Sequence, residues 1–398
     1  MRVMSFNARK DTSQPDGTDG RDGSDAWPHR RELLLEDIFA QNPDILGTQE
    51  LMPHMAAWLR EQLEPAGYSF VGRGRRATLL ERAARTADDG GTDDDGGVQG
   101  IDGTDEMTAV FFRKSRFSLV ESGHFWLSDT PEVPGSMAPD TPEGPPRMAT
   151  WLRLRDSVST APGDGTLLVM NTHLANGADS TQSFGARVIM KFLEEDRASR
   201  AEPQSVILSG DMNSNETSAA IATLRSGTGT AQLVDTYREF HPEPREMQAT
   251  SHPAWFAEEA TSSGDHPTPP FGKRIDFIFA STAAFEVVEA MIDRFEDKAA
   301  ATSESYPNQG SRMGKADGGA SMGDMVAVGF PSDHFAVLAI LQYRDDPSRL
   351  VKRSSLDTNP RAARHELTTA MFVFSSRHVL LGVLSVFSRY SSTVMLVP

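Results

Sequence analysis

One short stretch, Ser205–Ser214, constrains this chain more than any other. Its first residues are small or apolar and predict a buried strand, which ends in the sequence Ser-Gly-Asp-Met-Asn. Gly210 allows the backbone to turn tightly, and Asp211 and Asn213 follow it, two positions apart. Alternate residues of an extended segment point the same way, so a carboxylate and an amide are expected to face one pocket. Taken alone, this pattern is more often a plain turn than a functional site.

Other strand-like segments carry polar residues of the same kinds at one end. These residues are Asn7, Glu50, His173 and the pair Asp333-His334. The carboxyl ends of strands are where α/β sheets place their chemistry. Together with Asp211 and Asn213, these ends offer only carboxylate, amide and imidazole groups, which is the donor set of a magnesium-assisted phosphoryl site. Each residue has an ordinary structural explanation by itself, but chance agreement at every strand end is improbable.

Composition narrows the choice of metal and partner. The chain has 398 residues, enough for one large domain or two ordinary ones. It contains no cysteine, which favours magnesium, with manganese as the substitute, held by oxygen or imidazole ligands. The formal net charge of -17 argues against broad, non-specific adhesion to nucleic acid. It does not argue against an anionic substrate, because a bound divalent ion changes the local charge.

Three parts of the chain are expected to lie outside the folded core. Stretches near 73–104 and 302–324 are rich in glycine and are expected to be flexible surface insertions, the first carrying a basic cluster and then an acidic one. Residues 345–398 are expected to form a polar linker and a poorly ordered apolar tail. Charged residues interrupt the tail before it reaches the roughly 20 apolar residues that span a bilayer. An interfacial membrane helix is a disfavoured alternative.

The N-terminal segment also bears on location. Met1–Asn7 resembles a strand from its first residue and lacks the longer apolar run and cleavage site of a secretory signal. A cytoplasmic location is therefore expected, with nuclear and extracellular locations left open.

Six short motifs occur in an order that is specific as a set. They are Ser-Phe-Asn at 5–7, Gln-Glu at 49–50, Thr-His-Leu at 172–174, Gly-Asp-x-Asn at 210–213, Arg-Ile-Asp-Phe at 274–277 and Ser-Asp-His at 332–334. In this order they resemble the endonuclease/exonuclease/phosphatase superfamily, with its deoxyribonuclease I-like fold, over residues 1–344. The resemblance implies an α/β (α+β) domain built as a four-layer sandwich, in which two mostly antiparallel β-sheets pack face to face between outer helices.

The resemblance also implies that the chain is a metal-dependent hydrolase of phosphoesters, with roles for the matching residues. Glu50 would be the main magnesium ligand, with Asn7 and Asp333 lining the metal and phosphate site. Asp211 would orient or deprotonate the attacking water. Asn213 would help to hold the phosphate or the nucleophile.

The imidazoles and their supports complete the implied site. His334 would contact the scissile phosphate, with Asp333 steering its ring, and His173 would bind or polarise the phosphate. Three residues are expected as supports that do not touch the reacting atoms: Glu106, Arg274 and Asp276. Glu106 stands seven residues before a strand-ending arginine, Arg113, as a supporting glutamate does in the deoxyribonuclease branch. It is therefore expected to pair with His173.

Three functions compete at this point. The first is a phosphodiesterase for nucleic acid, in particular a 3′–5′ RNA exonuclease, because Trp27–Arg31, Phe125–Pro131 and Phe330–His334 resemble a bacterial-type subgroup near the deadenylase-like exonucleases. The second is a phosphatase or phosphodiesterase for a small or lipid phosphate, such as a sphingomyelinase-like, sugar or inositol phosphate substrate. The third, a catalytically silent scaffold, is disfavoured because every motif keeps its acidic and histidine residues. No stable protein partner is implied.

Overall fold

The computed structural model describes most of the first 344 residues. The described ranges are 1–12, 26–76, 105–139, 144–159, 165–200, 205–227, 232–243, 248–251, 273–294 and 331–344. The chain divides into two units, Met1–Arg344 and Asp345–Pro398, and every described residue belongs to the first. The predicted tail lies outside the described residues, and so do the predicted insertions, apart from residues 73–76.

Two sheets form the centre of the described fold. The first contains, in spatial order, β11 (Phe285–Asp293), β12 (Ala336–Tyr343), β1 (Arg2–Asn7), β2 (Ile45–Leu51), β4 (Met107–Arg113) and β3 (Tyr68–Val71). The second contains β5 (Phe117–Trp126), β6 (Met148–Asp156), β7 (Thr166–His173), β8 (Ser205–Asp211), β10 (Asp276–Ser281) and β9 (Leu233–Asp235). Within these sheets β1 is parallel to β2 and β7 to β8, whereas the other neighbours pair antiparallel.

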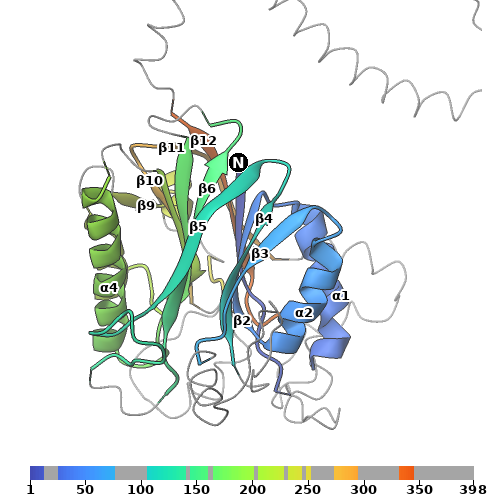
Figure 1. Cartoon of the computed structure of the whole chain (residues 1–398), viewed down its shortest axis with the longest axis horizontal. Coiled ribbons are helices and arrows are strands. Elements are labelled where there is room, and N and C mark those ends of the chain that lie inside the picture. The colour runs from blue at the N-terminus through green and yellow to red at the C-terminus, as the bar shows by residue number, and fades with distance from the viewer. Residues whose placement is uncertain are drawn as a thin grey trace, which may run out of the picture. The chain divides into compact units, whose positions relative to one another are not determined.

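Helices cover the outer faces of both sheets (Figure 1). They are α1 (Trp27–Gln41), α2 (Pro53–Leu63), α4 (Asp179–Ala198), α5 (Ala219–Arg225) and α6 (Thr236–Phe240). Proline occupies the first turn of α1 and of α2, where its missing N–H leaves no hydrogen bond unmade. The predicted four-layer sandwich is confirmed. None of the described helices is both long and apolar enough to cross a membrane.

Strict alternation along the strands builds three apolar layers. Along β1, Met4 packs toward α1 and α2, whereas Val3 packs between the two sheets. Along β8, Leu208 packs toward α4 and α5, and Ile207 faces the first sheet. The middle layer is therefore made by residues that point inward from both sheets.

The inward-pointing residues change from apolar to polar toward one end of the sandwich. On β1 the inward series is Val3, Ser5, Asn7, and on β8 it is Ile207, Ser209, Asp211, all of them buried. On β7, Asn171 and His173 follow Val169 in the same way. The two-residue period of the strands thus gathers the polar residues of both sheets at one end of the middle layer, where the candidate site lies.

A β-bulge in β2 adds one more inward side chain. Thr48 pairs with Ala109 of β4, but the next pair is Leu51 with Met107, so β2 contains one extra residue. Glu50 lies in this bulge with a φ of 57°, in the left-handed region. Without the bulge, alternation would send Glu50 to the helix-covered face, because its neighbour Gln49 already points inward. The bulge is what brings Glu50 to the site.

Candidate active site

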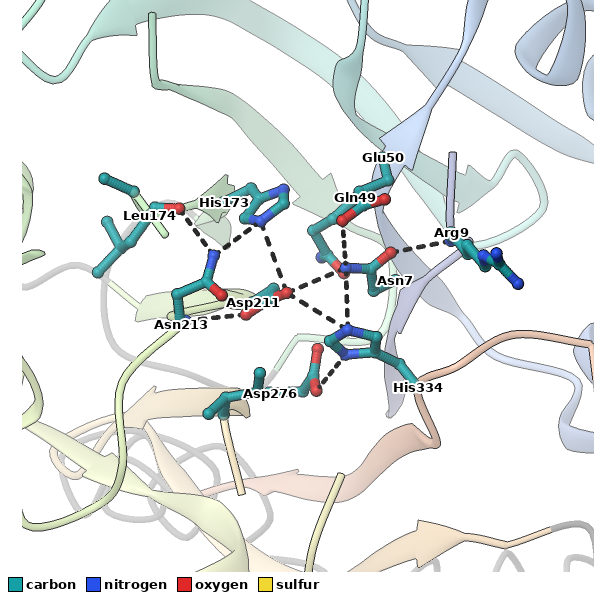
Figure 2. A network of polar contacts seen from close by, with 12 residues as sticks. Asn7, Arg9, Gln49, Glu50, His173, Leu174, Asp211, Asn213, Asp276 and His334 are labelled. Carbon is teal, nitrogen blue, oxygen red and sulfur yellow. Dashed lines mark hydrogen bonds and ion pairs between the residues drawn. The ribbon is translucent and has the colours of Figure 1, made fainter. Parts of the chain in front are cut away.

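The amide of Asn7 stands at the centre of the polar cluster shown in Figure 2. Its Nδ2 donates to Asp211 Oδ2 at 3.0 Å and to Glu50 Oε1 at 3.3 Å. The Arg9 backbone N–H donates to Asn7 Oδ1 at 2.9 Å, which fixes the orientation of the amide and keeps Nδ2 toward the acids. Asn7 and Glu50 belong to the first sheet and Asp211 to the second, so the site is shared between the sheets.

Asp211 lies between two imidazoles. The Nε2 atoms of His173 and His334 are 3.6 and 3.8 Å from its Oδ2, and the Asn213 backbone N–H donates to its Oδ1 at 2.8 Å. Burial, followed by the charge of Asp276, raises the pKa of Asp211 to about 7. A carboxyl group with such a pKa is suited to take up and release a proton near neutral pH.

His334 is oriented by Asp276. Its Nδ1 lies 2.8 Å from Asp276 Oδ2, so Nδ1 carries a proton and Nε2 faces Asn7 and Asp211. Burial acts to lower the pKa of His334, but the carboxylates of Asp276 and Asp211 outweigh it and raise this pKa well above its ordinary value. The expectation that Asp333 steers the ring is wrong. Asp333 Oδ1 lies 3.3 Å from Ser332 Oγ, and its side chain is only partly buried.

His173 is neutral, in contrast to His334. Asn213 Nδ2 donates to His173 Nε2 at 2.9 Å and to the Leu174 carbonyl at 3.0 Å, which leaves the ring proton on Nδ1. Burial, together with the charges of Arg147 and Arg75, lowers the pKa of His173 well below its ordinary value. The site therefore holds one cationic and one neutral imidazole on either side of Asp211.

Glu106 does not pair with His173 as the sequence predicts. Its carboxylate lies 2.6 Å from Arg75 Nη1 and 3.9 Å from Lys10 Nζ. A guanidinium is the stronger partner because it is always charged, whereas His173 is neutral here. Glu106, Arg75, Arg147 and His173 line one small pocket beside the cluster around Asp211. Arg75 belongs to the basic stretch that was expected to be a solvated insertion, but its side chain is only 11% exposed.

The Arg274 side chain binds carboxylates outside the cluster around Asp211. Its Nη2 lies 2.5 Å from Asp235 Oδ2 and 2.6 Å from Glu216 Oε2. These ion pairs hold the segment just before β10, whose first residue is Asp276. No contact of the Arg274 side chain with the residues around Asp211 is found in the described part of the chain.

The cluster fits a divalent cation. The possible ligand atoms of Asp211, Asp276 and His334 lie within 4.8 Å of one another, and the two carboxylates among them provide oxygens for a cation. Asp276 Oδ1 is buried and has no hydrogen-bond partner among the described residues. Glu50 is held to the same cluster by Asn7 and adds a further carboxylate. The pKa of Glu50 is below its ordinary value, because the Lys10 backbone N–H and the charge of His334 outweigh the effect of burial. Such a concentration of acidic oxygens is the donor set that hard cations prefer.

The sequence matches the family model described as the endonuclease/exonuclease/phosphatase family over residues 4–334. The chain belongs to this family. It is accordingly a hydrolase that acts on phosphoester bonds. A search of curated proteins finds no match.

Solved structures of the endonuclease/exonuclease/phosphatase family share the fold. A family member from Bacteroides vulgatus is 21% identical, with a TM-score of 0.56 over 86% of this chain and 98% of that chain. A mannosyl-6-phosphatase from Bacteroides thetaiotaomicron is 22% identical, with a TM-score of 0.52 over 86% of this chain and 99% of that one. The human Nocturnin catalytic domain is 18% identical, with a TM-score of 0.50 over 86% and 94%. These similarities establish the fold.

The sequence analysis assigned no role to three polar residues around the site. Arg147 precedes β6 and lines the pocket beside His173, while Gln49 and Asn171 are fully buried behind the catalytic cluster. The available signal was a polar residue one or two positions before each of two motif residues, Glu50 and His173, inside otherwise apolar strands. A buried amide in such a place must find hydrogen-bond partners, so it indicates a structural or positioning task.

Proposed function

We propose that this family member is a magnesium-dependent phosphodiesterase that hydrolyses nucleic acid, with 3′–5′ cleavage of RNA as the specific activity to test. One observation carries the proposal: Asn7 hydrogen-bonds both Glu50 and Asp211, so acids from two sheets converge between a cationic and a neutral imidazole. A phosphoryl group needs this combination, because attack by water requires a proton acceptor and developing negative charge requires donors.

In the proposed metal site Glu50 is the main ligand, and Asn7 lines the site by donating from Nδ2 to Glu50 and Asp211. Asp333 is the third predicted member. The buried Asp276 Oδ1 without a partner and the acid-rich donor set support a divalent ion, and the lack of cysteine favours magnesium. When bound, magnesium would neutralise charge on the phosphoryl oxygens and on the leaving oxygen.

Different residues of the chain accept a proton, donate a hydrogen bond and hold the phosphate. Asp211, with its pKa near neutrality, takes the proton of the attacking water. Protonated His334 donates from Nε2 to a phosphoryl oxygen, and Asp276 keeps its ring in place. Neutral His173 and Asn213, joined by a hydrogen bond, hold the phosphate on the opposite side of Asp211.

A basic rim supports an anionic substrate larger than a single phosphate. Arg147 and Arg75 line the pocket beside His173, and Lys10 lies across it against Glu106. The Nη1 atom of Arg147 is buried and has no hydrogen-bond partner in the part of the chain that the structure describes. Because the Arg147 side chain also lines the pocket, we propose that its guanidinium binds a second phosphate, as the next residue of a nucleic acid strand would offer.

The second candidate is a phosphatase or phosphodiesterase for a small or lipid phosphate. The net charge of -17 favours it, because long nucleic acid strands are repelled by an acidic surface. One similar structure is named a mannosyl-6-phosphatase, so a small sugar phosphate fits the same fold in that protein.

A mixed substrate panel separates the two candidates. Wild type and Asp211→Ala would be incubated with magnesium and poly(A) RNA, duplex DNA, sphingomyelin, inositol phosphates or sugar phosphates, and phosphate and nucleotide release would be measured. We expect nucleotides from RNA with wild type only. Turnover restricted to small or lipid phosphates would keep the site and replace the substrate. No turnover of any phosphoester would contradict the proposal.

A further inference from the structure

Asn171 joins the two sheets directly behind the candidate site. This residue of β7 is fully buried, and its Nδ2 crosses to the first sheet. There it donates to the carbonyl of Thr48 at 2.8 Å and to the carbonyl of Ala109 at 2.9 Å. Both donor hydrogens of the amide are therefore used on the backbone of the opposite sheet.

The two carbonyls belong to the pair where the β2 bulge begins. Thr48 and Ala109 are the last regular partners of β2 and β4 before the extra residue, and Glu50 follows in its left-handed conformation. A bulge interrupts the ladder and leaves backbone groups to be satisfied elsewhere. Buried carbonyls without a partner are destabilising, so the Asn171 amide supports the local geometry that turns Glu50 inward.

The acceptor side of Asn171 holds the residue next to Glu50. Gln49 Nε2 donates to Asn171 Oδ1 at 2.7 Å and to Ser5 Oγ at 3.2 Å. Gly47 leaves room for this arrangement, because a Cβ there would lie 2.9 Å from Asn171 Oδ1 and 2.5 Å from Ser209 Oγ. The backbone before Glu50 and the side chain beside it are thus both fixed by one amide from the sheet that carries Asp211.

We propose that Asn171 is a positioning residue for the metal ligand Glu50: it sets the bulge of β2 against the sheet that carries Asp211 and His173. The inference rests on the proposed function, because it assumes that Glu50 binds the divalent ion. Asn171 touches neither substrate nor metal. Its effect is on the distance and orientation of Glu50 relative to Asp211, two residues that Asn7 joins directly.

A merely structural role would have a different signature. Tyr343 provides a matched control, because its hydroxyl donates to Asp156 Oδ2 at 2.9 Å in a buried bond that also joins the two sheets. This bond lies at the other end of the strands: β12 begins beside His334 and ends at Tyr343. Tyr343→Phe would weaken the sandwich without touching the bulge.

The test measures metal binding rather than turnover. Metal-depleted wild type, Asn171→Leu, Tyr343→Phe and Glu50→Gln would be titrated with Mn²⁺ by calorimetry, with thermal unfolding recorded for each. We expect Asn171→Leu to bind Mn²⁺ about tenfold more weakly than wild type, a usual loss for a residue that orients a ligand. Tyr343→Phe should keep the wild-type affinity although its unfolding temperature falls.

The outcomes separate the inference from the proposed function. Wild-type affinity in folded Asn171→Leu, with binding lost in Glu50→Gln, would overturn the positioning role alone. No Mn²⁺ binding by wild type, or undiminished binding by Glu50→Gln, would overturn the metal assignment and the inference with it. If Asn171→Leu does not fold, Gln49→Met removes the bond to Asn171 Oδ1 and keeps both carbonyl bonds. It should weaken Mn²⁺ binding several-fold, and unchanged affinity would contradict the proposal.

Discussion

Asp276 Oδ2 lies 2.8 Å from His334 Nδ1, and both side chains are buried at the edge between the two sheets. The bond fixes which ring nitrogen of His334 faces Asp211 and keeps the ring protonated at neutral pH. Asp276 comes from β10 of the second sheet, whereas His334 precedes β12 of the first. The cationic donor of the site therefore depends on a contact between sheets.

Replacing Asp276 should disable this donor. In Asp276→Asn, His334 loses its nearest negative charge, so the pKa of His334 falls. As the pH rises, the ring then loses its proton at a lower pH than in wild type. We expect kcat to drop about a hundredfold or more, with little change in KM. The alkaline limb of the pH–rate profile should move to lower pH. Asp235→Asn is the matched control, since it removes another buried carboxylate that binds Arg274, and it should lower stability without moving the profile.

Replacing Asp211 should stabilise the metal-free protein while abolishing activity. The folded-state pKa of about 7 lies above the ordinary 3.8, so the folded protein holds this proton more tightly than the unfolded chain. The stability that the group contributes is complete below pH 3.8 and is lost as pH rises to about 7. In EDTA at pH 8, Asp211→Asn should therefore unfold at higher denaturant concentration than wild type. Its free energy of unfolding should be higher by on the order of 3 kcal/mol. Equal or lower stability of the variant at pH 8 would contradict the assignment of a destabilising buried charge.

Gly210 should tolerate no side chain. A Cβ at this position would lie 2.1 Å from the carbonyl oxygen of Thr172 on the neighbouring strand, and the backbone on both sides carries site residues. Gly210→Ala should lower the free energy of unfolding by about 3 kcal/mol. Gly67→Ala separates the clash from the cost of a positive φ, because Gly67 has a φ of +95° and a Cβ there would lie within 4 Å of no described atom beyond its chain neighbours. That variant should lose about 1 kcal/mol, and equal losses in the two proteins would exclude the clash.

Arg147 should affect binding of the substrate more than its conversion. Its guanidinium lines the pocket beside His173 and has an unpaired buried nitrogen among the described residues. We expect Arg147→Met to raise KM for an oligonucleotide about tenfold, with kcat changed far less. The exposed Arg197 on α4 offers a control of equal charge, and Arg197→Met should leave both constants unchanged. A fall in kcat alone would place Arg147 in the chemical step instead.

Several strands of the fold could be predicted from local patterns in the sequence. Short runs of apolar and small residues predicted the strands β1, β7 and β8, and the polar residues at their ends predicted that Asn7, His173 and Asp211 would meet. These predictions succeeded because a strand sends every second side chain to the same face, whatever the rest of the chain does.

The partners of individual side chains could not be predicted in the same way. Asp333 is next to His334 in sequence, yet Asp276 of β10 binds the ring. The segment 331–333 bends before β12 begins, so adjacency in sequence does not decide which carboxylate meets the imidazole. Glu106 was assigned to His173 by analogy, but Arg75 competes for it more strongly. The bulge at Glu50 depends on pairing with β4 and on Asn171, and neither is visible in the sequence around Glu50.

The most direct test of the account is hydrolysis of a simple phosphodiester, bis(p-nitrophenyl) phosphate, by the metal-depleted full chain. Rates would be recorded with EDTA, with magnesium, and with magnesium in Glu50→Gln and Asp211→Asn. The account predicts turnover only when wild type receives magnesium, and rates reduced at least a hundredfold in both variants. Equal turnover in EDTA, or undiminished turnover in either variant, would contradict the claim that these two acids from opposite sheets form a metal-assisted phosphoesterase site.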